Sequence, residues 1–140
     1  MSADVILETR GLVKEFKGFV AVDDVIGKFE LITYAVRIAA DGSSSEVWSL
    51  GHRNIQGAAL HPGTGELWAV EHGPQGGDEV NVVEAGRNYG WPLLTFGRNY
   101  GIGTRIGEEG PKAGFEQPLK TWVPTSIAPS GMAFLTSDRY

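Results

Sequence analysis

The sequence contains no cysteine. This absence excludes a disulfide framework, a thiolate nucleophile and a zinc site built on cysteine. Basic residues are also few, because 12 Lys and Arg stand against 17 Asp and Glu and give a net charge of -5. The Lys and Arg clusters that bind nucleic-acid phosphates are missing, and no apolar run approaches the ~20 residues needed to cross a bilayer. We therefore expect a soluble protein with no nucleic-acid and no membrane partner.

The first eight residues have neither a basic leader nor a long apolar segment, so they do not have the pattern of a secretory signal. As encoded, the chain is expected in the cytoplasm. Its 140 residues, 41% hydrophobic and 21% charged, are typical of one globular domain with a core of its own.

Proline is absent before Pro62, and sixteen of the twenty glycines lie at or beyond Gly51. This change in composition suggests two parts of different origin, residues 1–30 and residues 31–140. Short β-branched or aromatic runs between Gly and Pro turns predict strands at residues 5–9, 19–25, 46–50, 58–61, 66–71 and 79–83. No helix of any length is predicted. Many short strands with Gly-rich turns favour an all-β sandwich, barrel or propeller.

Two predicted loops gather most of the polar chemistry. Residues 51–57 read GHRNIQG and residues 71–79 read EHGPQGGDE. They combine a cation, amides, imidazoles and carboxylates with residues that favour turns. We expect the functional site at this pair of loops.

Four motifs carry a family resemblance: the two loops just described, NYGWP at residues 88–92 and SIAPSGM at residues 126–132. They closely resemble soluble sugar dehydrogenases that use pyrroloquinoline quinone (PQQ), which are periplasmic or secreted. The resemblance implies a six-bladed β-propeller with calcium and the quinone in a central cleft, of which this chain would form about two blades. It further implies that Arg53, Asn54 and Gln56 contact the quinone. The main-chain oxygens of Gly73 and Pro74 would hold calcium.

The residue types suit these roles. Calcium takes six to eight oxygen ligands and accepts main-chain carbonyls, while Asp78 and Glu79 add negative charge beside the Gly-Pro turn and complete the predicted metal set. Arg53 presents a planar fork of donors that matches a carboxylate.

Residues 4–25 resemble the opening strands of an ABC-transporter ATPase of the branched-chain amino-acid type. No Gly-x-x-x-x-Gly-Lys-Ser/Thr stretch follows them, so nothing would cradle phosphates and ATP hydrolysis is rejected.

The resemblance also constrains the activity. In the sugar dehydrogenases the general-base histidine comes from a part of the propeller that precedes the matched segment. His52 and His72 therefore do not inherit that role by position. Hydride transfer needs base, substrate and cofactor in one geometry.

The main hypothesis is a calcium-dependent hydrolase of lactones or esters. Bound calcium would polarise the carbonyl, and the candidate catalytic residues are Glu71, His72 and Asp78, with His52 as a second base. The chain also resembles a metagenome-derived calcium-dependent lactonase of acyl-homoserine signals, which would imply quorum quenching. Two alternatives remain open: a sugar dehydrogenase that uses PQQ and calcium, and a calcium-binding fragment without catalysis.

A partial propeller leaves blade faces and strand edges uncovered, and such surfaces favour association. We therefore expect an N-terminal strand pair and a homo-oligomer that completes the fold. Four tryptophans are expected to fill the core: Trp48, Trp68, Trp91 and Trp122.

Overall fold

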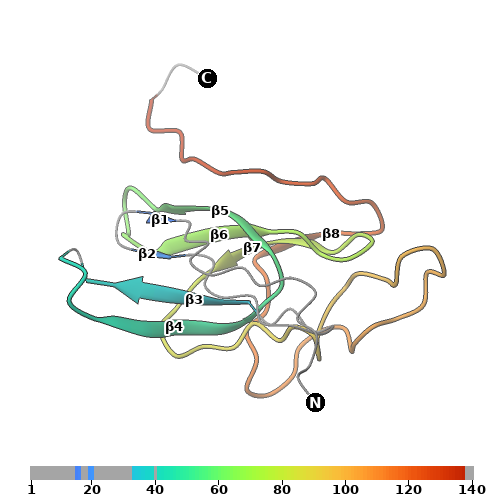
Figure 1. Cartoon of the computed structure of the whole chain (residues 1–140). Helices are drawn as coiled ribbons and strands as arrows, with labels where there is room; N and C mark the ends of the chain where they lie inside the picture. The colour runs from blue at the N-terminus through green and yellow to red at the C-terminus, as the bar shows by residue number, and fades with distance from the viewer. Residues whose placement is uncertain (1–14, 17–18, 21–32, 40, 138–140) are drawn as a thin grey trace, which may run out of the picture.

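The computed structural model describes residues 15–16, 19–20, 33–39 and 41–137. Eight strands form two four-stranded antiparallel sheets, and the described residues contain no helix (Figure 1). None of these segments could therefore cross a membrane as a long apolar helix. The prediction of an all-β chain is confirmed.

The first sheet has the order β1-β2-β3-β4. It consists of β1 (Glu15–Phe16), β2 (Phe19–Val20), β3 (Thr33–Ile38) and β4 (Ser45–His52). The pairing of β3 with β4 slips on both sides of Ala35, which lies opposite Ser49. The expected strand at 5–9 and the proposed boundary at residue 30 lie outside the described residues, and the division of the chain into two parts stays a prediction.

The second sheet has the order β5-β6-β7-β8. It consists of β5 (Ile55–Leu60), β6 (Leu67–Glu71), β7 (Asp78–Val82) and β8 (Lys120–Trp122). Only two residues separate the end of β4 from the start of β5, so the two sheets meet directly at this connection (Figure 1).

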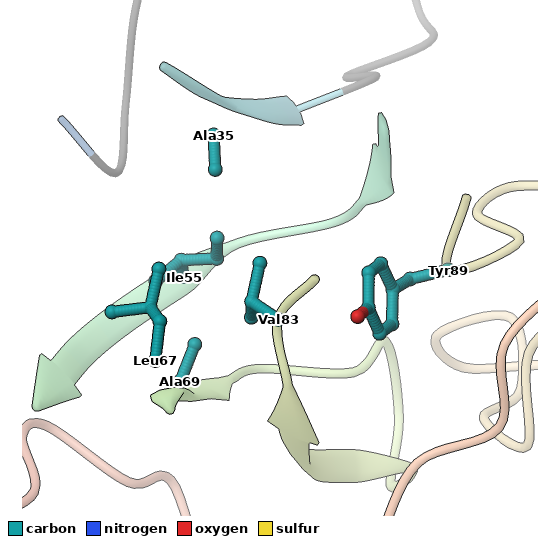
Figure 2. Close-up of a cluster of buried hydrophobic side chains, with 6 residues drawn as sticks. All are labelled: Ala35, Ile55, Leu67, Ala69, Val83 and Tyr89. Atoms are coloured by element: carbon teal, nitrogen blue, oxygen red, sulfur yellow. The ribbon is translucent and has the colours of Figure 1, made fainter. Parts of the chain in front are cut away.

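The hydrophobic core lies between the sheets. Figure 2 shows Ala35 of β3 directed towards side chains of the second sheet. The buried members of this cluster are Ala35, Ile55, Leu67, Ala69, Val83 and Tyr89, with Trp48 and Ala58 packed against them. Leu67 and Ala69 of β6 both face this core because successive side chains of a strand point to opposite faces.

Residues 123–137 run as an extended segment alongside the second sheet without joining it as a strand (Figure 1). A Cβ on Gly57 would lie 2.6 Å from the Cα of Gly131, so β5 and this segment approach too closely for a side chain at position 57. Further along, the ring of Phe134 packs edge-on against Trp68 and His61, with ring centroids 5.3 and 4.8 Å apart. We call residues 123–137 the C-terminal strap.

Candidate cofactor site

The two polar loops lie side by side. The first is the Arg53-Asn54 connection between β4 and β5, and the second is residues 72–77 between β6 and β7. The amide of His72 donates to the carbonyl of Asn54 over 3.0 Å. Nη1 of Arg53 donates to the carbonyls of His72, at 3.0 Å, and Gly73, at 2.6 Å. The expectation that these loops form one constellation therefore agrees with their hydrogen bonds.

A buried polar network lies beneath the first loop. His52 is fully buried, its Nδ1 lies 3.0 Å from Oε1 of Glu71, and its Nε2 lies 2.8 Å from the hydroxyl of Ser49. Its ring also stacks on Tyr89 with centroids 4.6 Å apart. Because an ionised carboxylate only accepts hydrogen bonds, the proton of the His52–Glu71 bond belongs to Nδ1.

Glu71 is the acceptor on which this network converges. Its Oε1 also receives Nδ2 of Asn81 at 2.8 Å, and its Oε2 receives the amide of Arg53 at 2.6 Å. Burial opposes ionisation, but the neighbouring His52 and the backbone amides outweigh it, so the pKa of Glu71 lies below its ordinary value. Glu71 is therefore held as a carboxylate inside the protein.

Asp78, at the start of β7, fastens the second loop to the C-terminal strap. Its Oδ1 receives the amide of Gly73 at 3.0 Å, and its Oδ2 receives the hydroxyl of Ser126 at 2.5 Å. The amides of Ile127 and Ala128 also donate to Oδ2, at 2.7 and 2.8 Å. Burial raises the pKa of Asp78, but these donors outweigh it and hold the pKa below its ordinary value.

The pKa of Glu79 is shifted in the opposite direction from those of Glu71 and Asp78. Burial, and then the charges of Glu71 and Asp78, raise the pKa of Glu79 to about 8. Nδ2 of Asn81, at 3.3 Å, is its hydrogen-bond donor here. At neutral pH Glu79 is thus mostly protonated, beside two carboxyl groups that are not.

A recess of about 240 Å³, open to solvent, lies at the junction of the loops. Arg53 stands in its wall with its guanidinium 5.3 Å from the ring centroid of Trp91. The indole nitrogen of Trp91 is buried and has no hydrogen-bond partner among the described residues. The recess is lined by Gly51, Arg53, Glu71, His72, Gly73, Gly77, Glu79, Tyr89, Trp91, Leu94 and Thr95.

Five of the predicted site residues meet at this recess, and the others do not. Arg53, Glu71, His72, Gly73 and Glu79 line it. Asn54 and Gln56 do not; they bond to each other, with Nε2 of Gln56 2.6 Å from Oδ1 of Asn54. The remaining candidates, His52, Pro74 and Asp78, also lie outside the lining.

Sequence reasoning missed three side chains that bond to predicted site residues without lining the recess themselves. Ser49 and Asn81 complete the buried network. Ser126 is one of the four donors to Asp78, and we call Asp78 with these donors the Asp78 clamp. Ser126 belongs to the SIAPSGM motif, which carried the family resemblance but no predicted role for its single residues. Trp91, expected in the core, lies in the recess wall instead.

Two of the four predicted calcium ligands, Gly73 and Asp78, are already engaged in hydrogen bonds. The carbonyl of Gly73 accepts from the cation Arg53, and the carboxylate of Asp78 accepts four donors. Within the described part of the chain, no group of three or more His, Asp or Glu side chains could hold a metal ion. As placed, these residues do not fit calcium at Gly73 and Asp78, and the metal assignment stays a prediction.

The family model of the glucose/sorbosone dehydrogenases matches residues 33–140. The chain belongs to this family. A curated family member, aldose sugar dehydrogenase YliI of Escherichia coli, is 50% identical over 105 residues, which are 74% of this chain and 28% of that protein. An uncharacterised protein of Synechocystis, slr1608, is 44% identical over 70% of this chain and 24% of its own length. The chain thus spans about a quarter of the length of these curated relatives.

Solved structures of the family agree with the fold. The apo form of the soluble aldose sugar dehydrogenase of Escherichia coli superposes with a TM-score of 0.74 at 35% identity, covering 96% of this chain and 45% of that one. The PQQ-bound aldose sugar dehydrogenase of Streptomyces coelicolor gives a TM-score of 0.54 at 32% identity, over 72% of this chain and 29% of that one. The two sheets are a partial β-propeller of the sugar dehydrogenase fold, and this prediction is confirmed. The resemblances to an ABC ATPase and to a lactonase find no support in these comparisons.

Proposed function

We propose that this chain provides the quinone-binding side of a PQQ-dependent sugar dehydrogenase. The observation that carries the proposal is the guanidinium of Arg53, held over Trp91 in the wall of an open recess. PQQ is a flat quinone with three carboxylates, and a guanidinium with five donors is the side chain best suited to such a group. The relative from Streptomyces coelicolor was solved in a PQQ-bound form.

The chemistry of the recess supports the same ligand. The buried indole N–H of Trp91 has no described partner, and a quinone or carboxylate oxygen would satisfy it. The enclosed part of the recess has room for about one water molecule, so it would take a single polar group at the edge of the cofactor rather than its ring system. When bound, the quinone would accept a hydride from the sugar; this chain would hold and orient it.

Replacing Arg53 tests this proposal. We expect R53A to weaken PQQ binding by at least about tenfold, because a charge-assisted hydrogen bond is lost, and R53K to restore only part of it. The measurement is a titration of PQQ absorbance or of tryptophan fluorescence with the purified chain.

R37A is the matched control. Arg37 lies 5.1 Å from the ring centroid of Trp48, much as Arg53 lies over Trp91, but it is exposed and outside the recess. Equal losses in R53A and R37A, or no PQQ binding by the unmodified chain, would contradict the proposal.

Calcium-dependent lactone hydrolysis is the other candidate, and no contact in the site favours it. Asp78 is committed to four donors, and His52 is fully buried, so neither is placed to activate water. A lactone panel with and without a chelator, run beside a PQQ-linked glucose assay, separates the two. We expect no chelator-sensitive hydrolysis.

The homo-oligomer and the cytoplasmic location stay proposals, which light scattering and fractionation would test.

A further inference from the structure

The buried chain Ser49–His52–Glu71 has the connectivity of a serine-hydrolase triad but not its access. Hydroxyl, imidazole and carboxylate follow one another at 2.8 and 3.0 Å. The exposed fractions of Ser49, His52 and Glu71 are 1%, 0% and 3%. A nucleophile must touch its substrate, so this arrangement is not a hydrolytic site.

The contacts of Glu71 point to a different role. Its Oε2 accepts the amide of Arg53 at 2.6 Å, which fixes the backbone from which the Arg53 side chain leaves. His72 and Gly73 follow Glu71 in the chain. Their carbonyls accept hydrogen bonds from the guanidinium of Arg53. The end of β6 therefore holds Arg53 at both its backbone and its side-chain end.

The orientation of Glu71 is itself set by two side chains. His52 and Asn81 both bond to Oε1, which leaves Oε2 directed at the amide of Arg53. They come from β4 and β7, on either side of β6 along the chain, so the carboxylate is fixed from both sheets.

We propose that Glu71 is a positioning residue: it sets the guanidinium of Arg53 over Trp91 at the recess, and His52 and Asn81 hold Glu71 in the orientation that does so. The consequence for a quinone rests on the proposed function, but the placement of Arg53 can be measured without any ligand. Glu71 and His52 then act through Arg53 rather than on a substrate.

The first test uses the unmodified full chain. The amide of Arg53, bonded to a buried carboxylate, should exchange its hydrogen at least about a hundredfold more slowly than an unprotected amide. Exchange at the unprotected rate would overturn the proposal, whether or not any variant folds.

The second test is E71Q, which keeps the side-chain volume but replaces the two-acceptor carboxylate with one acceptor and one NH₂ donor. We expect Arg53 to react with phenylglyoxal about fivefold faster, as for release of one hydrogen bond, while Arg37 in the same molecule is unchanged. S49A is the matched control, since it removes the His52–Ser49 bond from the same network and leaves Glu71 on Arg53. Unchanged Arg53 reactivity in E71Q, or an equal rise in S49A, would overturn the proposal.

PQQ titration adds a separate readout. If the unmodified chain binds PQQ, E71Q should bind about tenfold more weakly and S49A within about twofold of the unmodified chain. If it binds none, the proposed function fails, while hydrogen exchange and arginine reactivity still decide the role of Glu71. Equal PQQ affinity of E71Q and the unmodified chain would overturn the link between Glu71 and ligand binding.

Discussion

D78A is expected to destabilise the folded chain by about 3 kcal/mol, at ~1 kcal/mol for each hydrogen-bond donor that it leaves without an acceptor. The amides of Gly73 and Ile127 and the hydroxyl of Ser126 lose the acceptor that Asp78 provides, while the amide of Ala128 keeps a bond of 3.1 Å to the Ser126 hydroxyl. For a chain of this size, such a loss lowers the melting temperature by roughly 10 °C. Differential scanning calorimetry measures it directly.

D41A is the control for this experiment. Asp41 is exposed, and its carboxylate accepts the amide of Ser43, two residues away, at 2.9 Å. Its removal should leave the melting temperature close to that of the unmodified chain. D78N should fall between the two, since an amide supplies one acceptor to four donors. If D78A has the same melting temperature as the unmodified chain, the Asp78 clamp does not hold the C-terminal strap.

The unmodified chain should lose stability as pH rises from about 4.5 to about 8, and E79Q should largely remove this dependence. The pKa of Glu79 is about 8 in the folded protein and ordinary, near 4.5, when unfolded. The folded state therefore holds a proton that the unfolded state releases in this range, and ionisation favours unfolding as pH rises. The difference between E79Q and the unmodified chain should grow from near zero at pH 4.5 to about 2–5 kcal/mol at pH 8.

Thermal or urea unfolding between pH 4.5 and 8, with a chelator present, checks this expectation. E46Q is the matched control, because Glu46 is exposed and pairs with Arg37 at the surface. It should keep the pH dependence of the unmodified chain. A flat stability profile of the unmodified chain across this range would contradict the raised pKa of Glu79.

The strands that could be predicted are those whose own residues favour a strand and are bounded by turns. Residues 46–50, 66–71 and 79–83 carry β-branched or aromatic side chains between clear turns, and they match β4, β6 and β7 within a few residues. Strand β8 was missed because Lys120–Trp122 is three residues long and lies between two prolines, so only its pairing with β7 defines it. For β5 the prediction began at residue 58 rather than at Ile55, because the polar motif over residues 51–57 was interpreted as a loop.

The site was predictable as a location but not as a set of contacts. The two loops were identified from residue type, and Arg53 of the first loop lines the recess, while its contact with a quinone stays a prediction. The hydrogen bond from Asn81 to Glu71 depends on the pairing of β6 with β7. In that pairing Glu71 lies opposite Glu79, two residues from Asn81. The hydrogen bonds from the backbone amides of residues 127 and 128 to Asp78 have no local sequence signal, because every residue except proline carries an amide.

The Asp78 clamp also sets the order in which the chain can be completed. Its partners on the strap lie 48 to 50 residues further along the sequence, whereas the contacts between Glu71 and Arg53 span 18. Contacts between distant residues close the longest loops and form only once both ends exist. On the ribosome, Arg53 can therefore bond to Glu71 before residue 128 is synthesised, whereas Asp78 can bond to the strap only afterwards. During synthesis, the recess therefore gains its Arg53 wall before it gains the contacts that fasten its second loop to the strap.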